Sequence, residues 1–389
     1  MPTTIPRPSH QATVRALLRQ FPVVAVLGAR QVGKTTLARA IAAAQRGPVT
    51  FFDLESFEDR ARLADPLVAL RALRGLVIID EIQHVPELFR TLRVLVDATP
   101  RTRRFLILGS ASIALLQQST ESLAGRIAFH ELPGLDLTEV GSTRLERLWL
   151  RGGFPRAFLA RSEAETRRWR EEFIRTFLER DIPQLGLRLP AAALRRFWTM
   201  IAHYHGQTWN ASELGRAFGV AHTTVQRYLD VLAETYMVRQ LAPWFENISK
   251  RQVRAPRVYV RDSGILHQLL GIPDLRALES HPKIGASWEG FALERVLTHS
   301  GARTGEAFFW RTQGGAELDL LLVRGRTRLG FEFKRTAAPT VTPSMRAALT
   351  DLRLERLYVL CATAQPFDLG ARIRALPLGL IPDELPVLR

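Results

Sequence analysis

The first third of the chain alternates short apolar runs with helical patterns of apolar and polar positions. The apolar runs predict strands at residues 23–27, 49–54, 75–80, 104–108 and 127–132. Uninterrupted apolar runs of this length are typical of strands buried on both faces of a parallel sheet. Helical patterns cover residues 10–20 and the stretch that follows the first strand, to about residue 44. Strands that alternate with helices predict a three-layer α/β domain with a parallel sheet over residues 1–150.

The next part of the chain, residues 151–190, is predicted to be a helical connector or lid. A Gly-Gly-Phe-Pro run at residues 152–155 breaks the α/β pattern. Residues 163–181 then have the spacing of one amphipathic helix. Its aromatic residues share one face and are expected in the core: Trp169, Phe173 and Phe177.

Residues 191–265 are predicted to form a winged helix-turn-helix. A short helix that ends at Gly219 is followed by a second helix over residues 221–232. Two strands, 237–244 and 257–260, would form the wing. The predicted DNA contacts lie on the second helix and in the wing: Thr223, Thr224, Arg227, Lys250 and Arg251. The alternative is a winged-helix module that serves as a lid or as a protein-contact surface.

The last part of the chain, residues 266–389, is predicted to form an α/β domain around a hairpin. The pattern predicts a helix over residues 285–297 and strands at 307–310, 317–323 and 329–334. The turn at residues 324–326 joins the last two strands into a hairpin. Asp319 then lies on one strand, and Glu332 and Lys334 face the same side of its neighbour because they are two residues apart.

The turn after the first predicted strand is the candidate nucleotide site. It has the P-loop pattern G-x-x-x-x-G-K-[ST] from Gly28 to Thr35. Glycines let backbone N–H groups approach a phosphate, and the positive end of the following helix favours an anion. Lys34 would reach the β- and γ-phosphates of ATP, and Thr35 would hold Mg²⁺. The residues predicted to bind the nucleotide are Gly28, Ala29, Arg30, Gln31, Val32, Gly33, Lys34, Thr35 and Thr36.

Two acidic residues, Asp80 and Glu81, close the third predicted strand. Ligands of open α/β sheets bind at the carboxyl ends of the strands, so these acids predict the second half of the nucleotide site. Asp80 would hold Mg²⁺, directly or through water, and Glu81 would orient and activate the attacking water. Ser110 follows the fourth strand and would sense the γ-phosphate from between the P-loop strand and the acidic strand.

The order of these motifs resembles a bacterial and archaeal family of AAA-type ATPases. The motifs are G-A-R-Q-V-G-K-T-T, I-I-D-E-I-Q, L-G-S-A-S, L-A-G-R, E-L-P-G-L-D-L-T-E and G-G-F-P. The resemblance implies a nucleotide domain of the additional-strand, catalytic-glutamate class, followed by a C-terminal domain of unknown function related to restriction endonucleases. It implies catalytic roles for Lys34, Glu81 and Ser110. It also favours Arg126, in L-A-G-R, as the arginine that reaches a nucleotide in its own subunit or in a neighbouring subunit of a homo-oligomer; an ordinary surface arginine is the alternative.

The C-terminal hairpin resembles the PD-(D/E)xK nuclease superfamily in Asp319, Glu332 and Lys334. The acid on the preceding helix would be Glu289 or Glu294. The resemblance implies that Glu289, Asp319 and Glu332 hold Mg²⁺, which would polarise a scissile phosphate, and that Lys334 stabilises the developing charge. An active nuclease, an inactive nucleic-acid-binding fold and an unrelated sheet are the three alternatives.

Charge adds a candidate partner. Among 389 residues, 54 are Lys or Arg and 38 are Asp or Glu, which gives a net charge of +16. This balance indicates an anionic partner such as DNA. A base-composition bias is the alternative, because almost all of the basic residues are arginine. Two of the few lysines, Lys34 and Lys334, stand at motif positions that arginine serves poorly.

The remaining composition excludes several classes of protein. A single cysteine, Cys361, excludes an internal disulfide framework and a zinc site built from cysteines. No apolar run approaches the roughly 20 residues that a membrane-spanning helix needs. The first residues lack the apolar core of a signal peptide, so a cytoplasmic protein without a membrane partner is expected.

Two functions agree with these patterns. The first is an Mg²⁺-dependent ATPase, in which water attacks the γ-phosphate, coupled to DNA binding and to DNA processing. The alternative is a nucleotide-controlled switch or interaction protein, of a defence or toxin–antitoxin type. In that case the nuclease-like domain is inactive and the domains behind the ATPase bind a protein partner.

Overall fold

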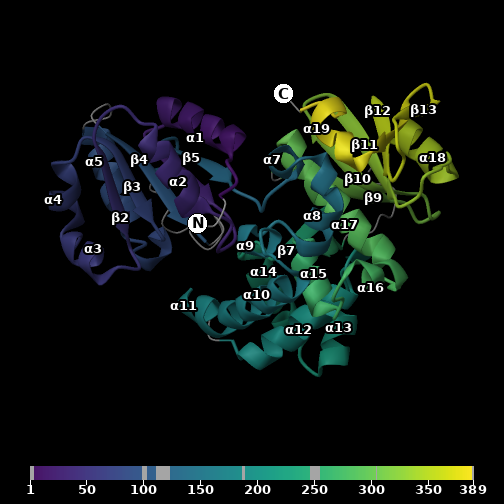
Figure 1. The fold of residues 1–389 in the computed structure, drawn as a ribbon, viewed down its shortest axis with the longest axis horizontal. Coiled ribbons are helices and arrows are strands. Elements are labelled where there is room, and N and C mark those ends of the chain that lie inside the picture. Colours follow the sequence, from purple (N-terminus) through teal and green to yellow (C-terminus); the bar gives the residue numbers. More distant parts are fainter. Residues whose placement is uncertain are drawn as a thin grey trace. The chain divides into compact units, whose positions relative to one another are not determined.

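The computed structural model describes residues 4–98, 103–110, 123–185, 189–245, 255–303 and 305–387. The chain divides into two compact units (Figure 1). The first comprises residues 1–134 with 234–236, and the second comprises residues 135–233 with 237–389. Within the described ranges, no helix is both long enough and apolar enough to span a membrane.

The first unit is built on a parallel sheet, as the sequence predicts. Its strands, in spatial order, are β2 (Val49–Asp53), β3 (Gly75–Asp80), β4 (Arg103–Gly109), β1 (Val23–Leu27) and β5 (Ile127–Glu131). Every neighbouring pair is parallel. Its helices are α1 (Pro8–Gln20), α2 (Lys34–Ala43), α3 (Phe57–Arg62), α4 (Pro66–Arg71) and α5 (Leu88–Ala98). The predicted strands are confirmed, and β4 lies between the P-loop strand β1 and the acidic strand β3.

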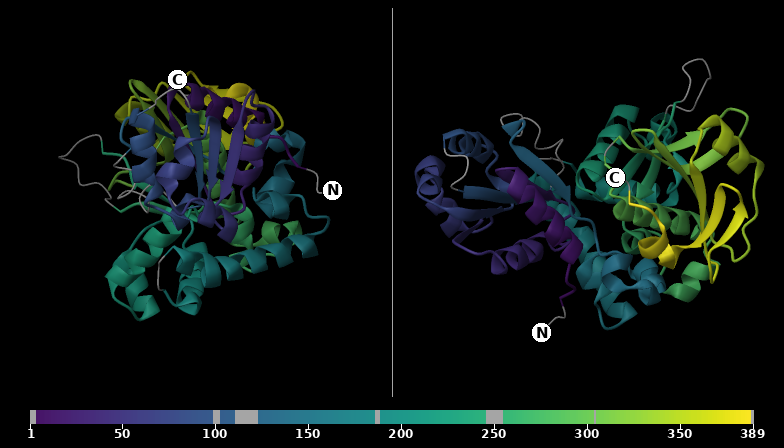
Figure 2. Two further views of the ribbon diagram at one scale, coloured as in Figure 1. Left: turned by 90° about the vertical axis from the view of Figure 1, so that its left-hand side faces the viewer. Right: turned by 90° about the horizontal axis from the view of Figure 1, so that it is seen from above.

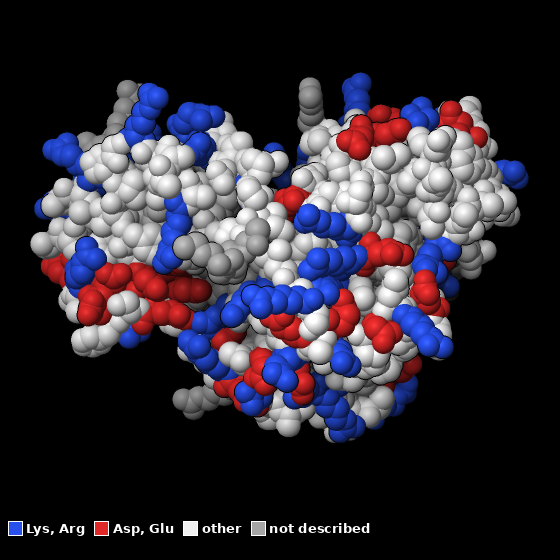
Figure 3. Space-filling view, in the orientation of Figure 1, with Lys and Arg blue, Asp and Glu red and all other residues white. Residues whose placement is uncertain are grey.

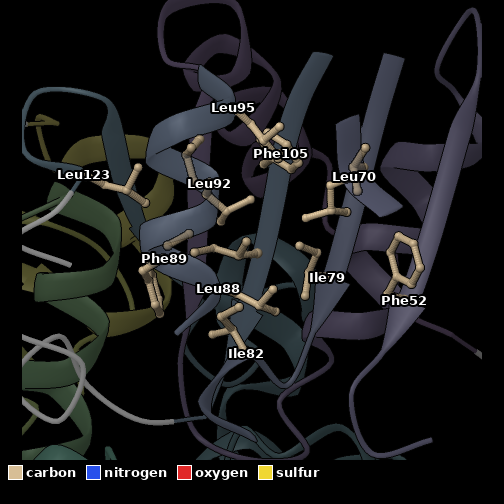
Figure 4. Packing of buried hydrophobic residues seen from close by; sticks show 14 of the residues in the cluster. Phe52, Leu70, Ile79, Ile82, Leu88, Phe89, Leu92, Leu95, Phe105 and Leu123 are labelled. Atoms are coloured by element: carbon tan, nitrogen blue, oxygen red, sulfur yellow. The ribbon is translucent and has the colours of Figure 1, made fainter. Parts of the chain in front are cut away.

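Helices cover both faces of this sheet (Figure 2), and its central strand β1 is accordingly apolar and buried throughout. Helices α1 and α2 pack on one face, and α5 packs on the other. The apolar side of α5, with Leu88 and Leu92, faces Ile79 of β3 and Phe105 of β4 (Figure 4). Burial of each such side chain contributes about 1.5–3 kcal/mol. This packing holds in place the two strands whose ends carry the acids and Ser110.

The second unit contains a nine-stranded sheet in the order β13-β14-β12-β11-β10-β9-β7-β8-β6. Its strands are β6 (Gln207–Thr208), β7 (Val238–Pro243), β8 (Arg257–Val260), β9 (Ala307–Arg311), β10 (Glu317–Arg324), β11 (Thr327–Lys334), β12 (Arg356–Cys361), β13 (Phe367–Gly370) and β14 (Ile373–Pro377). Its α-helices are α7 (Leu137–Val140), α8 (Leu145–Arg151), α9 (Pro155–Phe158), α10 (Glu163–Thr176), α11 (Ile182–Gln184), α12 (Ala191–His203), α13 (Ala211–Phe218), α14 (His222–Glu234), α15 (Ser263–Leu269), α16 (Leu275–Ser280), α17 (Ile284–Ser300), α18 (Pro343–Asp351) and α19 (Ile381–Glu384).

The first unit ends at residue 134, before the boundary expected at residue 150. The segment after residue 134 is held by the second unit, because Arg295 Nη1 donates to the Leu135 carbonyl at 2.7 Å. The Gly-Gly-Phe-Pro run then turns around Asp262, whose Oδ2 accepts from the Gly153 N–H at 2.7 Å. Gly152 has a φ of +82°, and a Cβ there would lie 2.2 Å from Asp262 Oδ1. Glycine is therefore required at that position for both conformation and space.

The amphipathic helix of the connector is longer than expected. Helix α10 continues through a π-helical turn, Phe177–Asp181, into α11, so the helical path passes Pro183 instead of ending at Asp181. A widened turn gives room to a proline, which has no N–H to donate. The predicted core role of the aromatics is confirmed for Phe173 and Phe177, which are each 3% exposed.

The two helices of the predicted helix-turn-helix are confirmed as α13 and α14. Gly219, with a φ of +72°, ends α13 in the left-handed conformation. Strands β7 and β8 pair antiparallel, and β6 pairs with β8 on its other side. The predicted contacts Lys250 and Arg251 lie outside the described residues.

The predicted C-terminal hairpin is also confirmed. Strands β10 and β11 pair antiparallel through Arg324 and Thr327, so the second strand begins before the expected residue 329. The pairing of β10 with β9 shifts register between Leu318 and Leu321, which places Asp319 at a local irregularity. Such irregularities re-aim side chains, and here they affect a candidate site residue.

Candidate functional site

The P-loop folds tightly over the end of β1. Gly28 has a φ of +155°, and a Cβ there would lie 2.3 Å from the Leu132 carbonyl oxygen. Gly33 has a φ of +99° and caps the start of α2. Lys34 is the first residue of that helix, and its buried amine donates to the carbonyls of Gly28 and Ala29, both at 3.0 Å. The loop and the lysine thus form a compact unit that presents the helix N-terminus to an anion.

Thr35 and Asp80 meet beside the loop. The Thr35 hydroxyl donates to Asp80 Oδ2 at 2.6 Å. Burial raises the pKa of Asp80, although the hydrogen bond from Thr35 opposes this. A hydroxyl and a carboxylate are the oxygen ligands that Mg²⁺ takes from a protein when phosphates complete its coordination. These two residues therefore fit the predicted metal role.

Glu81 is held by two polar neighbours. It adopts the left-handed conformation, with φ 53° and ψ 49°, immediately after β3. Its Oε2 accepts a hydrogen bond from Gln83 Nε2, which also donates to Ser110 Oγ at 2.9 Å. Ser110 Oγ itself lies 3.3 Å from Glu81 Oε2. The candidate base is consequently tied to the end of β4, the neighbouring strand.

The other predicted nucleotide residues follow the loop. Ala29 and Val32 are buried, Arg30 pairs with Glu55, and Gln31 and Thr36 are exposed. Arg7, which the sequence did not single out, donates from Nη1 to the Val32 carbonyl at 3.3 Å and to the Pro133 carbonyl at 3.0 Å. An N-terminal arginine thus braces the P-loop against the chain that follows β5.

Arg126 lies away from these residues within its own unit. It precedes β5, and its carbonyl accepts from Val23 N at 3.2 Å, so it lies at the amino-terminal edge of the sheet. The P-loop is at the opposite edge, about 16 Å away at 3.3 Å per strand residue. The guanidinium binds Asp97, with Nη2 and Oδ2 at 3.1 Å. The structure does not bring Arg126 to its own P-loop, and contact with a neighbouring subunit's nucleotide stays a prediction.

The predicted nuclease-like residues do come together in the second unit. Lys334 Nζ lies 3.1 Å from Glu332 Oε2. Burial, and then the charge of Asp319, raises the pKa of Glu332. The same two causes, in the same order, raise the pKa of Glu289. Three carboxylates and one lysine therefore form a cluster, defined here as Glu289, Asp319, Glu332 and Lys334.

Arg257 of β8 enters this cluster, which the sequence did not predict. Its Nη1 lies 3.3 Å from Asp319 Oδ1 and 3.6 Å from Glu289 Oε1, and its Nη2 lies 2.9 Å from Glu317 Oε2. Burial would lower the pKa of Arg257, but the neighbouring Tyr259, Glu289 and Asp319 raise it above its usual value. The Arg257 side chain is 7% exposed, and its guanidinium stays charged among these acids.

The alternative helix acid, Glu294, is directed elsewhere. It pairs with Arg239 and with Arg261, whose Nε lies 3.5 Å from Glu294 Oε2. Although burial would raise the pKa of Glu294, these arginines lower it to about 2. Glu289 is thus the residue of α17 that joins the cluster.

Two proteins from mycobacteria are close in sequence. The uncharacterized proteins Rv2008c of Mycobacterium tuberculosis and Mb2031c of Mycobacterium bovis are each 50% identical to this chain over 377 residues. The match covers 97% of this chain and 85% of each relative. The chain belongs to their family.

Family models divide the chain into three parts. An AAA domain matches residues 20–141, a domain of unknown function (DUF8612) matches residues 142–276, and a second one (DUF4143) matches residues 284–381. The predicted AAA-type domain and the C-terminal domain of unknown function are therefore confirmed. The likeness of the C-terminal part to nucleases rests on its residues alone.

Solved structures of ATPases resemble the fold at low identity. The Walker-type ATPase of Pyrococcus abyssi shares 14% identity, with a TM-score of 0.47, over 69% of this chain and 96% of that chain. The Holliday junction branch migration motor RuvB of Thermotoga maritima shares 18% identity, with a TM-score of 0.31, over 61% of this chain and 90% of that chain. With TM-scores below 0.5, neither carries any weight for the function of the family.

Gln83 donates a hydrogen bond to Glu81, the candidate base, so its replacement tests whether this contact positions the carboxylate. Gln83→Ala should lower kcat for ATP hydrolysis about tenfold, because a hydrogen bond to a charged group contributes about 1.5–3 kcal/mol. KM should change little, since Gln83 contacts Glu81 and Ser110 and not the P-loop. Steady-state kinetics separate the two constants, with the exposed Gln45→Ala as the control. An unchanged kcat, or a rise in KM alone, would contradict this role.

Proposed function

We propose that the first unit binds ATP with Mg²⁺ and hydrolyses it by attack of water on the γ-phosphate. One observation carries the proposal. Lys34, the Thr35–Asp80 pair and Glu81 come together where β1 and β3 end, with Ser110 at the end of β4 between them. The AAA domain matched at residues 20–141 supports it.

Each residue has a role that its position supports. The backbone N–H groups of the loop and the Lys34 amine bind the β- and γ-phosphates. Thr35 and Asp80 would hold Mg²⁺, which would supply positive charge against the phosphate oxygens. Glu81 accepts a proton from the attacking water, and Ser110 orients the γ-phosphate or that water.

We propose further that this turnover responds to DNA bound at α14. The elements α12, β6, α13, α14, β7 and β8 follow one another as in a winged helix, and β8 lies between β7 and β6. On α14, Thr223 and Arg227 are exposed while Val225 and Leu229 are buried. A helix whose first turns are polar and exposed is the kind that enters a major groove.

The charge distribution limits how DNA would be held. On the face shown in Figure 3, basic side chains of the second unit are interspersed with acidic ones. The net charge of +16 is therefore not gathered into one uninterrupted basic surface on that face. Binding through a few phosphate contacts near α14 agrees with this pattern better than wrapping of a long duplex does.

Arg227→Glu is expected to weaken duplex DNA binding and to remove any stimulation of ATP turnover by DNA. If Arg227 contacts one phosphate, the slope of log K against log salt should fall by about one. Arg276→Glu makes the same charge change at an exposed site on α16 and should leave the slope unchanged. Fluorescence anisotropy gives the slope, and phosphate release with and without DNA gives the stimulation.

The outcomes of this experiment separate the two parts of the proposal. No phosphate release with Mg²⁺ under any condition would refute ATP hydrolysis. Release that is indifferent to DNA, together with an equal salt slope in Arg227→Glu and wild type, would refute the coupling. That second result would favour the switch or interaction protein whose second unit binds a protein partner.

A further inference from the structure

The carboxylate cluster of the second unit already contains a cation, and that cation belongs to the chain. Arg257 and Tyr259 are two residues apart on β8 and therefore face the same side of the strand. Arg257 Nη1 contacts both Asp319 and Glu289, at 3.3 and 3.6 Å. The Tyr259 hydroxyl donates to Glu289 Oε1 at 2.6 Å. One short strand thus supplies a positive charge and a hydrogen-bond donor to the acids.

Four of the six carboxylate oxygens in the cluster contact donors of the chain itself. Asp319 Oδ2 accepts from the Phe333 N–H at 3.1 Å, and its Oδ1 contacts Arg257. Glu332 Oε2 contacts Lys334, which leaves Glu332 Oε1 as a buried oxygen without a hydrogen bond. Mg²⁺ needs ligands at about 2.0–2.1 Å in octahedral geometry, and both oxygens of Asp319 already contact donors of the chain itself.

The predicted metal site at Glu289, Asp319 and Glu332 consequently does not fit this arrangement. Among the residues that the structure describes, no group of three or more His, Cys, Asp or Glu side chains could hold a metal ion. The physical reason is the guanidinium, whose Nη1 lies between the two acids that a metal would have to bridge. The sequence pattern predicted the carboxylates of the cluster but not Arg257, which pairs with them.

We propose that Arg257 takes the place of a divalent cation in the carboxylate cluster, so that the second unit binds no metal there and cleaves no phosphodiester. The arginine is well suited to this. Its guanidinium is planar, stays charged and reaches three carboxylates from one position. It also lies over the Phe309 ring, 5.0 Å from the ring centre, which fixes its plane. The cluster then joins β8 to β10 and α17 instead of acting on a substrate.

The experiment compares Mn²⁺ binding and thermal unfolding in nucleotide-free protein. Wild type should unfold at the same temperature with and without excess MnCl₂. Arg257→Gln should unfold roughly 10 °C lower, because buried acids lose their charge partner. Mn²⁺ should restore much of that loss by occupying the vacated position. The restoration should vanish in the double variant Arg257→Gln with Asp319→Asn.

Arg239→Gln is the matched control. It also removes an arginine from a buried carboxylate of α17, Glu294. Within the described part of the chain, Arg239 forms no ion pair with a second acid. This variant should unfold earlier than wild type and should gain nothing from Mn²⁺. If Mn²⁺ raised the unfolding temperature of Arg239→Gln as much as that of Arg257→Gln, the proposal would be overturned. Mn²⁺ would then bind wherever a buried carboxylate loses its arginine.

Three further results would overturn the proposal. The first is a folded Arg257→Gln that gains no stability from Mn²⁺. The second is that wild type binds Mn²⁺, as measured by electron paramagnetic resonance, and that Asp319→Asn does not. If Arg257→Gln does not fold, the comparison of wild type with Asp319→Asn still tests the proposal. Equal Mn²⁺ binding by these two proteins supports it. Metal-dependent DNA cleavage by wild type that is lost in Asp319→Asn would also refute it.

Discussion

Lys34→Ala is expected to lower the affinity for ATP by at least about 100-fold, roughly 3 kcal/mol. The lysine amine is buried and donates to two carbonyls of its own loop, Gly28 and Ala29. It is thus aimed across the turn that would enclose the phosphates. Alanine removes the positive charge from that position and leaves the loop carbonyls without this donor. Titration of a fluorescent ATP analogue, monitored by anisotropy, measures the loss.

Two control variants sharpen this expectation. Lys34→Arg keeps the charge but replaces a compact ammonium by a planar guanidinium, so it should also bind ATP poorly. Lys283→Ala removes a lysine that precedes α17 in the second unit and should leave affinity unchanged. If Lys34→Ala bound ATP as well as Lys283→Ala, the P-loop assignment would be wrong.

The arrangement of the candidate nucleotide site could be predicted from sequence because most of its geometry is local. Gly28, Gly33, Lys34 and Thr35 lie in one turn, and the backbone conformation of that turn follows from the glycines. Asp80 ends an apolar strand, and parallel strands place their carboxyl ends at one edge of a sheet. The parallel direction of the strands thus determines at which edge of the sheet the acids lie.

The parts that could not be predicted depend on contacts between distant segments. Glu289 and Glu294 are five residues apart on α17, about 140° around the helix at 100° per residue, so they point to different neighbours. Only the packing of α17 decides that Glu289 meets Asp319 and that Glu294 meets Arg239. Likewise Arg257 is 62 residues before Asp319, and no local pattern connects the two.

Arg126 shows a different limit of sequence reasoning. A motif shows where an arginine stands along the chain. It does not show at which edge of the sheet that arginine lies. Here it precedes β5, whereas the P-loop follows β1, and the two strands run parallel. An arginine at the start of one strand and a loop at the end of its parallel neighbour lie at opposite edges.

Glu81→Gln is expected to keep ATP affinity within about twofold of wild type and to lower hydrolysis by about 10²–10⁴-fold, the range of a lost general base. Glutamine has nearly the same shape, and its carbonyl oxygen can still accept the hydrogen bond that Gln83 donates to Glu81 Oε2. The conformation after β3 should therefore persist. What glutamine lacks is a carboxylate that can take a proton from water.

Single-turnover hydrolysis, measured beside nucleotide binding in the same preparation, separates these two effects. Glu87→Gln makes the same chemical change at an exposed position six residues on and should leave both quantities unchanged. If Glu81→Gln hydrolysed ATP as fast as Glu87→Gln, another group would have to be the base. Loss of binding together with hydrolysis would instead show that Glu81 maintains the loop, because its links to Gln83 and Ser110 tie β3 to β4. The split between binding and turnover therefore tests chemistry at Glu81 separately from its place in the fold.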